Sequence, residues 1–477
     1  MIESSLNLFD VMYLDRSSVT IYQCLGHGSE ILLALTCKSF HARLKEINFK
    51  YNHSISPQKR IYYIQRLELM NYALDKLNLP IDNTIKYMLL RYNCQEALKL
   101  LIQRNLMSVN DNVNWEFTEN NNYNDNNNSS SSSKRVVNVT TTTTAIAATY
   151  GHVLLLEYLI NNNGRVDMWC CRGAASRGHL DCIQYIRKLD STTITTTTIP
   201  PMDAFCVRYA AANGHLHVLK YLHEDCIPAC PWTSEATTQA AANGHLDCLL
   251  YLINHDCPCK EDAATSAVLN NQLLSLQLLQ NNNIKMHKFI THYAAEAGSL
   301  DCLKFLIESG YHCDSRACRF AAEFGHLSCL QYLYEMEIAI DDRCSANAAA
   351  NNHLNCLKFL HKQGCKWNSW SCAQAARHNN IICLKYLLDH KCPCDAFTIN
   401  SAVSNGHLRC VILLRESYNC PCDKWASFIA AEKGYLECFK YLHINGCEID
   451  ERAEKTARRH GHSVIIDYML ENNLIKD

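Results

Sequence analysis

The stretch AANGHLDCLLYLINHDCPC, residues 241–259, is the most informative about the fold, because closely similar stretches recur along the chain. Residues 211–226 read AANGHLHVLKYLHEDC, and residues 321–338 read AAEFGHLSCLQYLYEMEI. Taken alone, the three cysteines and two histidines of the first stretch suggest a metal site. Taken with its copies, the stretch is one unit of a repeat array.

The Gly of each Gly–His pair, or the residue that stands in its place, marks the period, and we term it the anchor of its repeat. The anchors are Gly151, Gly178, Gly214, Gly244, Asn271, Gly298, Gly325, Asn352, Asn379, Gly406, Gly434 and Gly461. Eight of the eleven intervals are 27 residues, and the others are 36, 30 and 28. Every anchor is Gly or Asn, the residues that best tolerate a positive φ. We therefore expect the anchor to form the turn between two helices.

The residues around each anchor predict two helices. The fourth and third residues before it form a small pair, such as Ala321–Ala322, which lets neighbouring helices approach closely. After it, apolar residues stand at plus two, four, five and eight, a spacing that gives a helix one broad apolar face. Plus seven is usually aromatic. A stacked neighbour must cover that face, so the pattern predicts an all-α solenoid of helix-turn-helix units.

The string AAxxGHLxxLxxLxxxG resembles the ankyrin repeat over residues 145–477, where the anchors mark about twelve repeats. Two features differ from that family. The unit is 27 residues rather than about 33, and the family's TPLH opening is absent. The missing residues would come from the β-hairpin fingers between repeats, so we expect short or missing fingers. The resemblance implies a non-enzymatic scaffold that presents a concave surface to a protein partner.

The N-terminal part follows the period less well or not at all. Residues 1–60 contain EILLALTCKSFHARLKE, which resembles the last helix of an F-box through Leu32, Leu35, Cys37, Lys38 and Phe40. That resemblance implies docking to ubiquitin-ligase subunits of the cullin type, with the repeats as substrate receptor. The alternative, which we favour, is a helix that caps the array. Residues 61–117 are predicted to be degenerate repeats, with EALKLLIQRNL as a second helix.

Two polar tracts interrupt the array. Residues 118–144 are rich in Asn, Ser and Thr, and residues 191–198 read STTITTTT. Such tracts cannot bury a core, so we predict a disordered insert and an exposed loop.

The composition of the chain indicates the kind of cellular compartment in which it folds. The chain has 28 cysteines but neither an export signal nor an apolar run of about 18 residues. We expect a reducing compartment, the cytoplasm or the nucleus, with thiols that are mostly free and packed. A formal net charge of −2 favours neither nucleic acid nor membrane as a partner.

The cysteines and histidines are predicted to be structural. Position plus four holds Cys in eight repeats and Leu155, Val218, Ser275 or Ile465 in the others, and the exchange of Cys with Leu, Val and Ile indicates a packing position. The CPC pairs, such as Cys257–Cys259, fall in turns and offer no complete zinc tetrad. The histidine after each anchor is predicted to bond the backbone of the turn, since Gln272, Asn380 and Ser299 replace it. No catalytic motif is present. We therefore expect no metal, no cofactor and no enzymatic activity.

One position is a candidate for partner binding. Nine residues before the anchor, in what we term the minus-nine row, stand Trp169, Phe205, Phe289, Trp370, Phe397 and Trp425. The other repeats hold Thr142, Glu235, Asp262, Arg316, Arg343 and Arg452 there. A position that exchanges Trp for Arg belongs to the surface, and both types are enriched in binding hot spots. The alternative is that each aromatic side chain only covers the loop of the neighbouring repeat.

Overall fold

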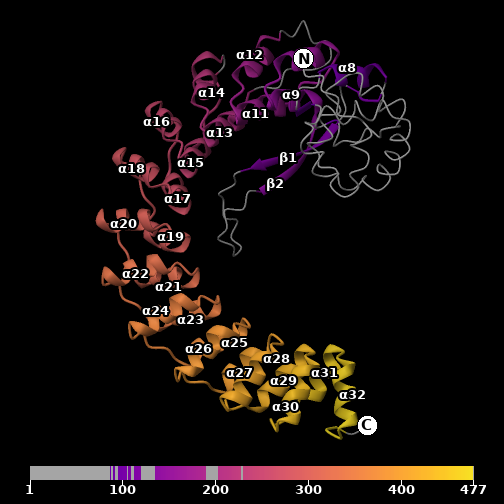
Figure 1. Cartoon of the computed structure of the whole chain (residues 1–477), viewed down its shortest axis with the longest axis vertical. Coiled ribbons are helices and arrows are strands. Elements are labelled where there is room, and N and C mark those ends of the chain that lie inside the picture. The colour runs from indigo at the N-terminus through magenta and orange to yellow at the C-terminus, as the bar shows by residue number, and fades with distance from the viewer. Residues whose placement is uncertain are drawn as a thin grey trace, which may run out of the picture. The chain divides into compact units, whose positions relative to one another are not determined.

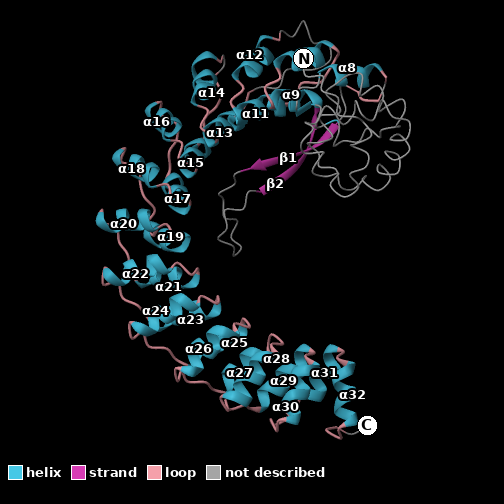
Figure 2. Ribbon diagram, in the orientation of Figure 1, coloured by secondary structure: helices cyan, strands magenta, loops and turns pink. Residues whose placement is uncertain are grey.

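The computed structural model describes residues 86, 90–91, 95–104, 106–108, 112–119, 135–189, 202–226 and 229–475. Figures 1 and 2 show these residues as a succession of short helices. They fall into two compact units, Met1–Asn121 with Ser133–Ala236, and Asn122–Ser132 with Thr237–Asp477. The segment 1–60, predicted to be a cap or an F-box, and the tract 191–198 lie outside the described residues.

The first unit begins with α8 (Gln95–Gln103), where a second helix of a degenerate repeat was predicted. Leu101 of this helix is fully buried. The later helices are α9 (Thr143–Thr149), α10 (Val153–Asn161), α11 (Met168–Arg177), α12 (Leu180–Lys188), α13 (Ala204–Ala212), α14 (Leu216–Lys220) and the π-helix η1 (Tyr221–Asp225). The boundary between the units falls inside α15 (Ser234–Ala242).

Part of the segment predicted to be disordered, residues 118–144, is a β-strand. Strand β2 (Arg135–Thr142) pairs antiparallel with β1 (Asn112–Glu119), from Asn112 opposite Thr142 to Glu119 opposite Arg135. The sequence RVVNVTTT is almost entirely β-branched, which favours a strand. The prediction weighed the polar tract before it and overlooked this run. Thr142 then caps α9, because its side chain accepts a hydrogen bond from the Ala145 N–H.

The second unit continues the alternation of helix pairs. Its helices are α16 (Leu246–Asn254), α17 (Glu261–Leu269), α18 (Leu273–Asn281), α19 (Ile290–Ala297), α20 (Leu300–Glu308), α21 (Ser315–Glu323), α22 (Leu327–Glu335), α23 (Asp342–Ala350), α24 (Leu354–Lys362), α25 (Ser369–Arg377), α26 (Ile381–Asp389), α27 (Ala396–Val403), α28 (Leu408–Ile412), the π-helix η2 (Leu413–Ser417), α29 (Lys424–Lys433), α30 (Leu436–Ile444), α31 (Ala453–His460) and α32 (Ser463–Glu471). From α16 to α26 in this unit, the first helices lie on the inner side of the curve and the second helices on the outer side (Figure 1).

The predicted helical solenoid is confirmed. Every anchor has a positive φ, between 54° at Asn271 and 79° at Gly325, and separates the two helices of its repeat. The loops between repeats are short: six residues, 309–314, join α20 to α21. From residue 145 to 475, the described part of the chain has no strand, so the expectation of short or missing fingers is also confirmed.

The core follows the predicted positions. The alanine pairs, such as Ala348–Ala349, are fully buried, and so are the leucines at plus five and plus eight, such as Leu303 and Leu306. In the second unit the first helices pack against one another more extensively than the second helices do. Small residues allow that close approach, which explains why the unit curves toward the first helices.

One repeat that is a residue longer than the standard unit accommodates the extra residue within its second helix. The interval from Gly406 to Gly434 is 28 residues, one more than the standard 27. Its second helix changes from α28 into the π-helix η2, which takes up one additional residue per turn. The plus-four and plus-eight residues of this repeat, Cys410 in α28 and Leu414 in η2, remain fully buried.

Candidate functional site

The minus-nine row lies at the start of the first helices, as predicted. Phe205, Trp370, Phe397 and Trp425 are exposed, at 39%, 45%, 50% and 45% of their surface, while Trp169 and Phe289 are half-buried. Trp370, Phe397 and Trp425 belong to three successive repeats of the second unit. Three large aromatic side chains therefore stand partly in solvent at equivalent positions.

A helix cap fixes the backbone of the row. The side chain two residues before the row residue accepts a hydrogen bond from the row residue's N–H. Asp423 Oδ1 accepts from the Trp425 N–H at 3.1 Å, and Asn368 Oδ1 accepts from the Trp370 N–H at 3.1 Å. The same contact joins Asp167 to Trp169, Asp203 to Phe205, Asp314 to Arg316 and Asp450 to Arg452. The caps orient the row by local backbone geometry.

Row residues of adjacent repeats touch one another. The Trp370 and Phe397 rings are stacked, with centroids 5.8 Å apart and planes 13° apart. The Arg316 guanidinium lies 4.5 Å from the centre of the Phe289 ring, and that of Arg452 lies 4.8 Å from the Trp425 ring. Two helices pack at about 8–10 Å, so these rings lean toward their neighbours. The row is continuous at these points.

The cap carboxylates also hold the arginines of the row. Asp314 accepts hydrogen bonds from Arg316 Nε and Nη2, and Asp450 makes the same pair with Arg452. Bonding to the Arg452 side chain lowers the pKa of Asp450 to about 2, and Arg316 likewise lowers the pKa of Asp314. Both carboxyl groups are therefore ionised at neutral pH.

The first unit builds the row from the same residue types. Arg172, one turn after Trp169, lies 5.5 Å from the Trp169 ring and 4.4 Å from the Phe205 ring. Arg172 also forms an ion pair with the cap residue Asp203 of the next repeat. Arg208, at the equivalent position, pairs with the row residue Glu235 at 3.6 Å.

Sequence reasoning missed this link between repeats. The residue six before an anchor donates to the cap carboxylate of the next repeat in Arg172–Asp203, Arg319–Asp341 and Asn400–Asp423. The signal was present, since Asp stands eleven residues before seven of the anchors, and Asn before an eighth. These residues are Asp167, Asp203, Asp314, Asp341, Asn368, Asp395, Asp423 and Asp450. An acidic residue at a fixed place before a helix predicts an N-cap.

The histidines after the anchors bond backbone, but the backbone of the preceding repeat. His326 Nε2 lies 2.9 Å from the Glu296 carbonyl oxygen, and His462 Nε2 lies 3.0 Å from that of Glu432. Because a carbonyl only accepts, Nε2 carries the proton in both rings. Asn380 makes the equivalent bond to the Ala350 carbonyl. These side chains therefore join adjacent turns.

The cysteines at plus four are packing residues. Cys182, Cys302, Cys356, Cys383 and Cys410 are fully buried, and Cys248, Cys329 and Cys438 nearly so. Burial raises the pKa of the Cys356 and Cys383 thiols to about 11. Among the described cysteines 23 are free and one pair, Cys422–Cys447, is a disulfide. In the described part of the chain, no group of three or more metal-binding side chains that includes a cysteine converges on one point.

The minus-nine row offers apolar and charged groups that can contact another molecule. The row holds aromatic, guanidinium and capped carboxylate groups, without a nucleophile beside a base. No helix within the described ranges combines the length and apolar character needed to cross a bilayer.

The fold and the row define a helical repeat protein. The family model for ankyrin repeats (3 copies) matches residues 264–344 and 291–371. Residues 264–371 are therefore similar to ankyrin repeats, which confirms over this part of the array the resemblance predicted from the sequence. No curated protein matches the chain. The human ASB11 ankyrin repeat domain is a similar solved structure, at 20% identity over 37% of this chain and 96% of that one, with a TM-score of 0.32. Ankyrin repeats indicate a protein–protein interaction module.

Proposed function

We propose that the chain is a non-enzymatic scaffold that binds a protein partner along the minus-nine row. The observation that supports this most directly is the run of Trp370, Phe397 and Trp425 in successive repeats, each 45–50% exposed. Aromatic and Arg side chains dominate binding hot spots. Because caps and stacking already order these side chains, docking would cost little side-chain entropy.

The length of the run suggests what kind of partner segment it accepts. Trp370 to Arg452 spans four repeats, which at about 10 Å per repeat is about 30 Å. A helix or an extended segment of a protein covers such a distance, whereas one small molecule does not. We place this interaction in the cytoplasm, where most of the thiols would stay reduced.

Site-specific crosslinking tests the proposal. A photoreactive phenylalanine analogue at position 397 should capture the partner from cells, and the same analogue at Ile444 is the matched control. Ile444 is 75% exposed on α30, a second helix, away from the row. The partner found at 397 should then bind the purified chain, and more weakly when Phe397 is Ala. Equal capture at both positions would contradict the proposed surface.

The F-box alternative concerns residues 1–60, outside the described residues, and it stays a prediction. Deleting these residues separates the two functions. Loss of ubiquitin-ligase subunits together with an intact repeat partner would favour the adaptor. Unchanged partners would favour the plain scaffold.

A further inference from the structure

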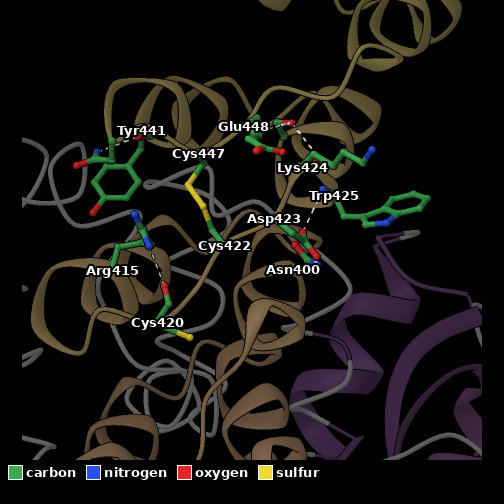
Figure 3. Close-up of a disulfide and its surroundings, with 12 residues drawn as sticks. Asn400, Arg415, Cys420, Cys422, Asp423, Lys424, Trp425, Tyr441, Cys447 and Glu448 are labelled. Carbon is green, nitrogen blue, oxygen red and sulfur yellow. Dashed lines mark hydrogen bonds between the residues drawn. A yellow bond between two sulfur atoms is a disulfide. The ribbon is translucent and has the colours of Figure 1, made fainter.

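Two loops near the C-terminus bring cysteines of neighbouring repeats together. Twelve residues before the anchor Gly434 stands Cys422, and fourteen before the next anchor, Gly461, stands Cys447. These two form the disulfide in Figure 3, with Cα atoms 6.2 Å apart. One repeat earlier, the same two positions hold Cys394 and Cys420.

This matched arrangement is confined to two repeat boundaries. Among the boundaries from the anchor Gly151 to Gly461, only these two have cysteine at both positions. The other boundaries have a cysteine at one of the two positions or at neither. Cys259 corresponds to Ile284, and Cys313 corresponds to Ile338.

The Cys420 thiol lies against the loop that carries Cys394. It donates to the carbonyl of Asp395, the residue after Cys394, at 3.3 Å, and Cys394 adds to burial in raising the pKa of the Cys420 thiol. Arg415 Nη1 donates to the Cys420 carbonyl at 2.9 Å and holds this loop (Figure 3). Cys394 is half-buried and Cys420 fully buried, which matches Cys422, half-buried, and Cys447, 5% exposed.

We propose that Cys394 and Cys420 are a second disulfide site, oxidised by exchange with a small-molecule disulfide such as oxidised glutathione. With Cys422–Cys447, the new bond would join three successive inter-repeat loops. Each of these loops leads into a cap: Asp395 of α27, Asp423 of α29 and Asp450 before α31. The crosslinks would therefore fix the helix starts that carry Phe397, Trp425 and Arg452.

The exchange proceeds in two balanced steps. The Cys394 thiolate attacks one sulfur of oxidised glutathione, forms a mixed disulfide and releases one glutathione thiolate. Cys420 then gives its proton to that thiolate and its sulfur attacks Cys394, which releases the second glutathione. Two protein thiols are oxidised and one glutathione disulfide is reduced to two thiols. Burial raises the pKa of the Cys420 thiol, so we expect the second step to be slow and the Cys394 adduct to accumulate first.

Redox titration of the full chain tests the site. The protein is equilibrated in glutathione buffers of increasing oxidised fraction, its thiols are blocked, and crosslinked peptides are identified by mass spectrometry. We expect a Cys394–Cys420 crosslink that dithiothreitol removes, together with a melting temperature several degrees higher. Cys394→Ser should abolish this crosslink and the part of the increase in melting temperature that the crosslink causes. It should leave the Cys422–Cys447 disulfide intact. Cys313→Ser, which removes an unmatched cysteine, should change neither.

Adding a cysteine at the matched position of another repeat boundary tests whether these two positions are sufficient for a disulfide. Ile338→Cys creates a partner for Cys313, and we expect a third reversible crosslink in this variant. The proposal is overturned if only Cys422–Cys447 forms at every glutathione ratio, or if Cys394 pairs with a cysteine other than Cys420. Stoichiometric zinc that shields Cys394 and Cys420 from oxidation would overturn it as well.

Discussion

The His353 ring packs directly on Gly325 of the preceding repeat. A Cβ atom added to Gly325 would lie closer than 3.0 Å to three atoms of that ring, nearer than a Cβ ordinarily comes. The same relation joins Gly298 to His326 and Gly434 to His462. The anchor therefore needs glycine for two reasons, a positive φ and the space that the next repeat's side chain occupies.

This contact changes what substitution at the anchor should do. Backbone geometry alone predicts that Gly325→Asn is mild and Gly325→Val severe, because a left-handed conformation costs a β-branched residue about 1–2 kcal/mol or more. With His353 in place, Asn should also destabilise. Two of the three natural Asn anchors show the compensation: Asn271 is followed one repeat on by Ser299, and Asn352 by Asn380, whereas Asn379 is followed by His407. Gly325→Asn with His353→Asn should therefore melt close to the native chain, and Gly325→Asn alone clearly lower. Equal melting of the two Asn variants would show that the contact is unimportant.

A second turn, twelve residues after the anchor, allows the effect of a positive φ on stability to be measured without a contact from the next repeat. Gly310 has a φ of 82° with no atom within 4 Å of an added Cβ, whereas Glu337 occupies the equivalent position at 57°. We expect Glu337→Gly to stabilise by about 0.5–1 kcal/mol and Gly310→Ala to destabilise by about 1 kcal/mol. Urea unfolding of both variants measures this. A loss of stability in Glu337→Gly would mean that glutamate contacts outweigh the strain.

The period predicted the anchors, the buried alanines and the pair of helices in each repeat because each was repeated up to twelve times. Contacts between repeats were harder to predict, since a period relates a residue to its equivalents and not to what it touches. The contact between the Arg316 guanidinium and the Phe289 ring, for example, depends on the tilt between two adjacent first helices, which the period does not give. The disulfide was missed because its two cysteines hold different positions within their repeats, minus twelve and minus fourteen.

Acidification should destabilise the array through the turn histidines. Burial lowers the pKa of His179, His326 and His353 below the ordinary value of about 6.5. The unfolded chain then binds more protons than the folded chain as the pH falls through 6.5, so stability decreases there and levels off below the folded pKa. His326→Gln with His353→Gln should flatten this dependence, because Gln272 already serves in one repeat. Denaturant unfolding between pH 5 and 8 checks the slope. Stability that rises on acidification would contradict the burial argument.

The cysteines should not require metal. The plus-four thiols are separated by whole repeats, and burial keeps those such as Cys356 protonated at neutral pH. Chelator treatment should leave the helical circular dichroism unchanged, and metal analysis should find less than about one zinc per chain. Stoichiometric zinc with unfolding on its removal would refute the packing interpretation.

The exposed tryptophans of the row separate binding from packing. Trp370 stacks on Phe397 and Trp425 lies beneath Arg452, and each is 45% exposed. An aromatic pair and an exposed cation–π contact each contribute about 0.5–1 kcal/mol, so Trp370→Ala with Trp425→Ala should cost about 1–2 kcal/mol of stability. If the row binds the partner, each substitution should weaken affinity by about 1–3 kcal/mol.

The matched control for the tryptophans is Ile382→Ala with Ile444→Ala, which removes two side chains that are 60% and 75% exposed on second helices. Melting curves and titration calorimetry with the captured partner are measured for both double variants. The tryptophan variant should lose affinity and keep most of its stability, while the isoleucine variant keeps both. If the tryptophan variant melts far lower yet binds normally once folded, the row serves only to pack neighbouring repeats.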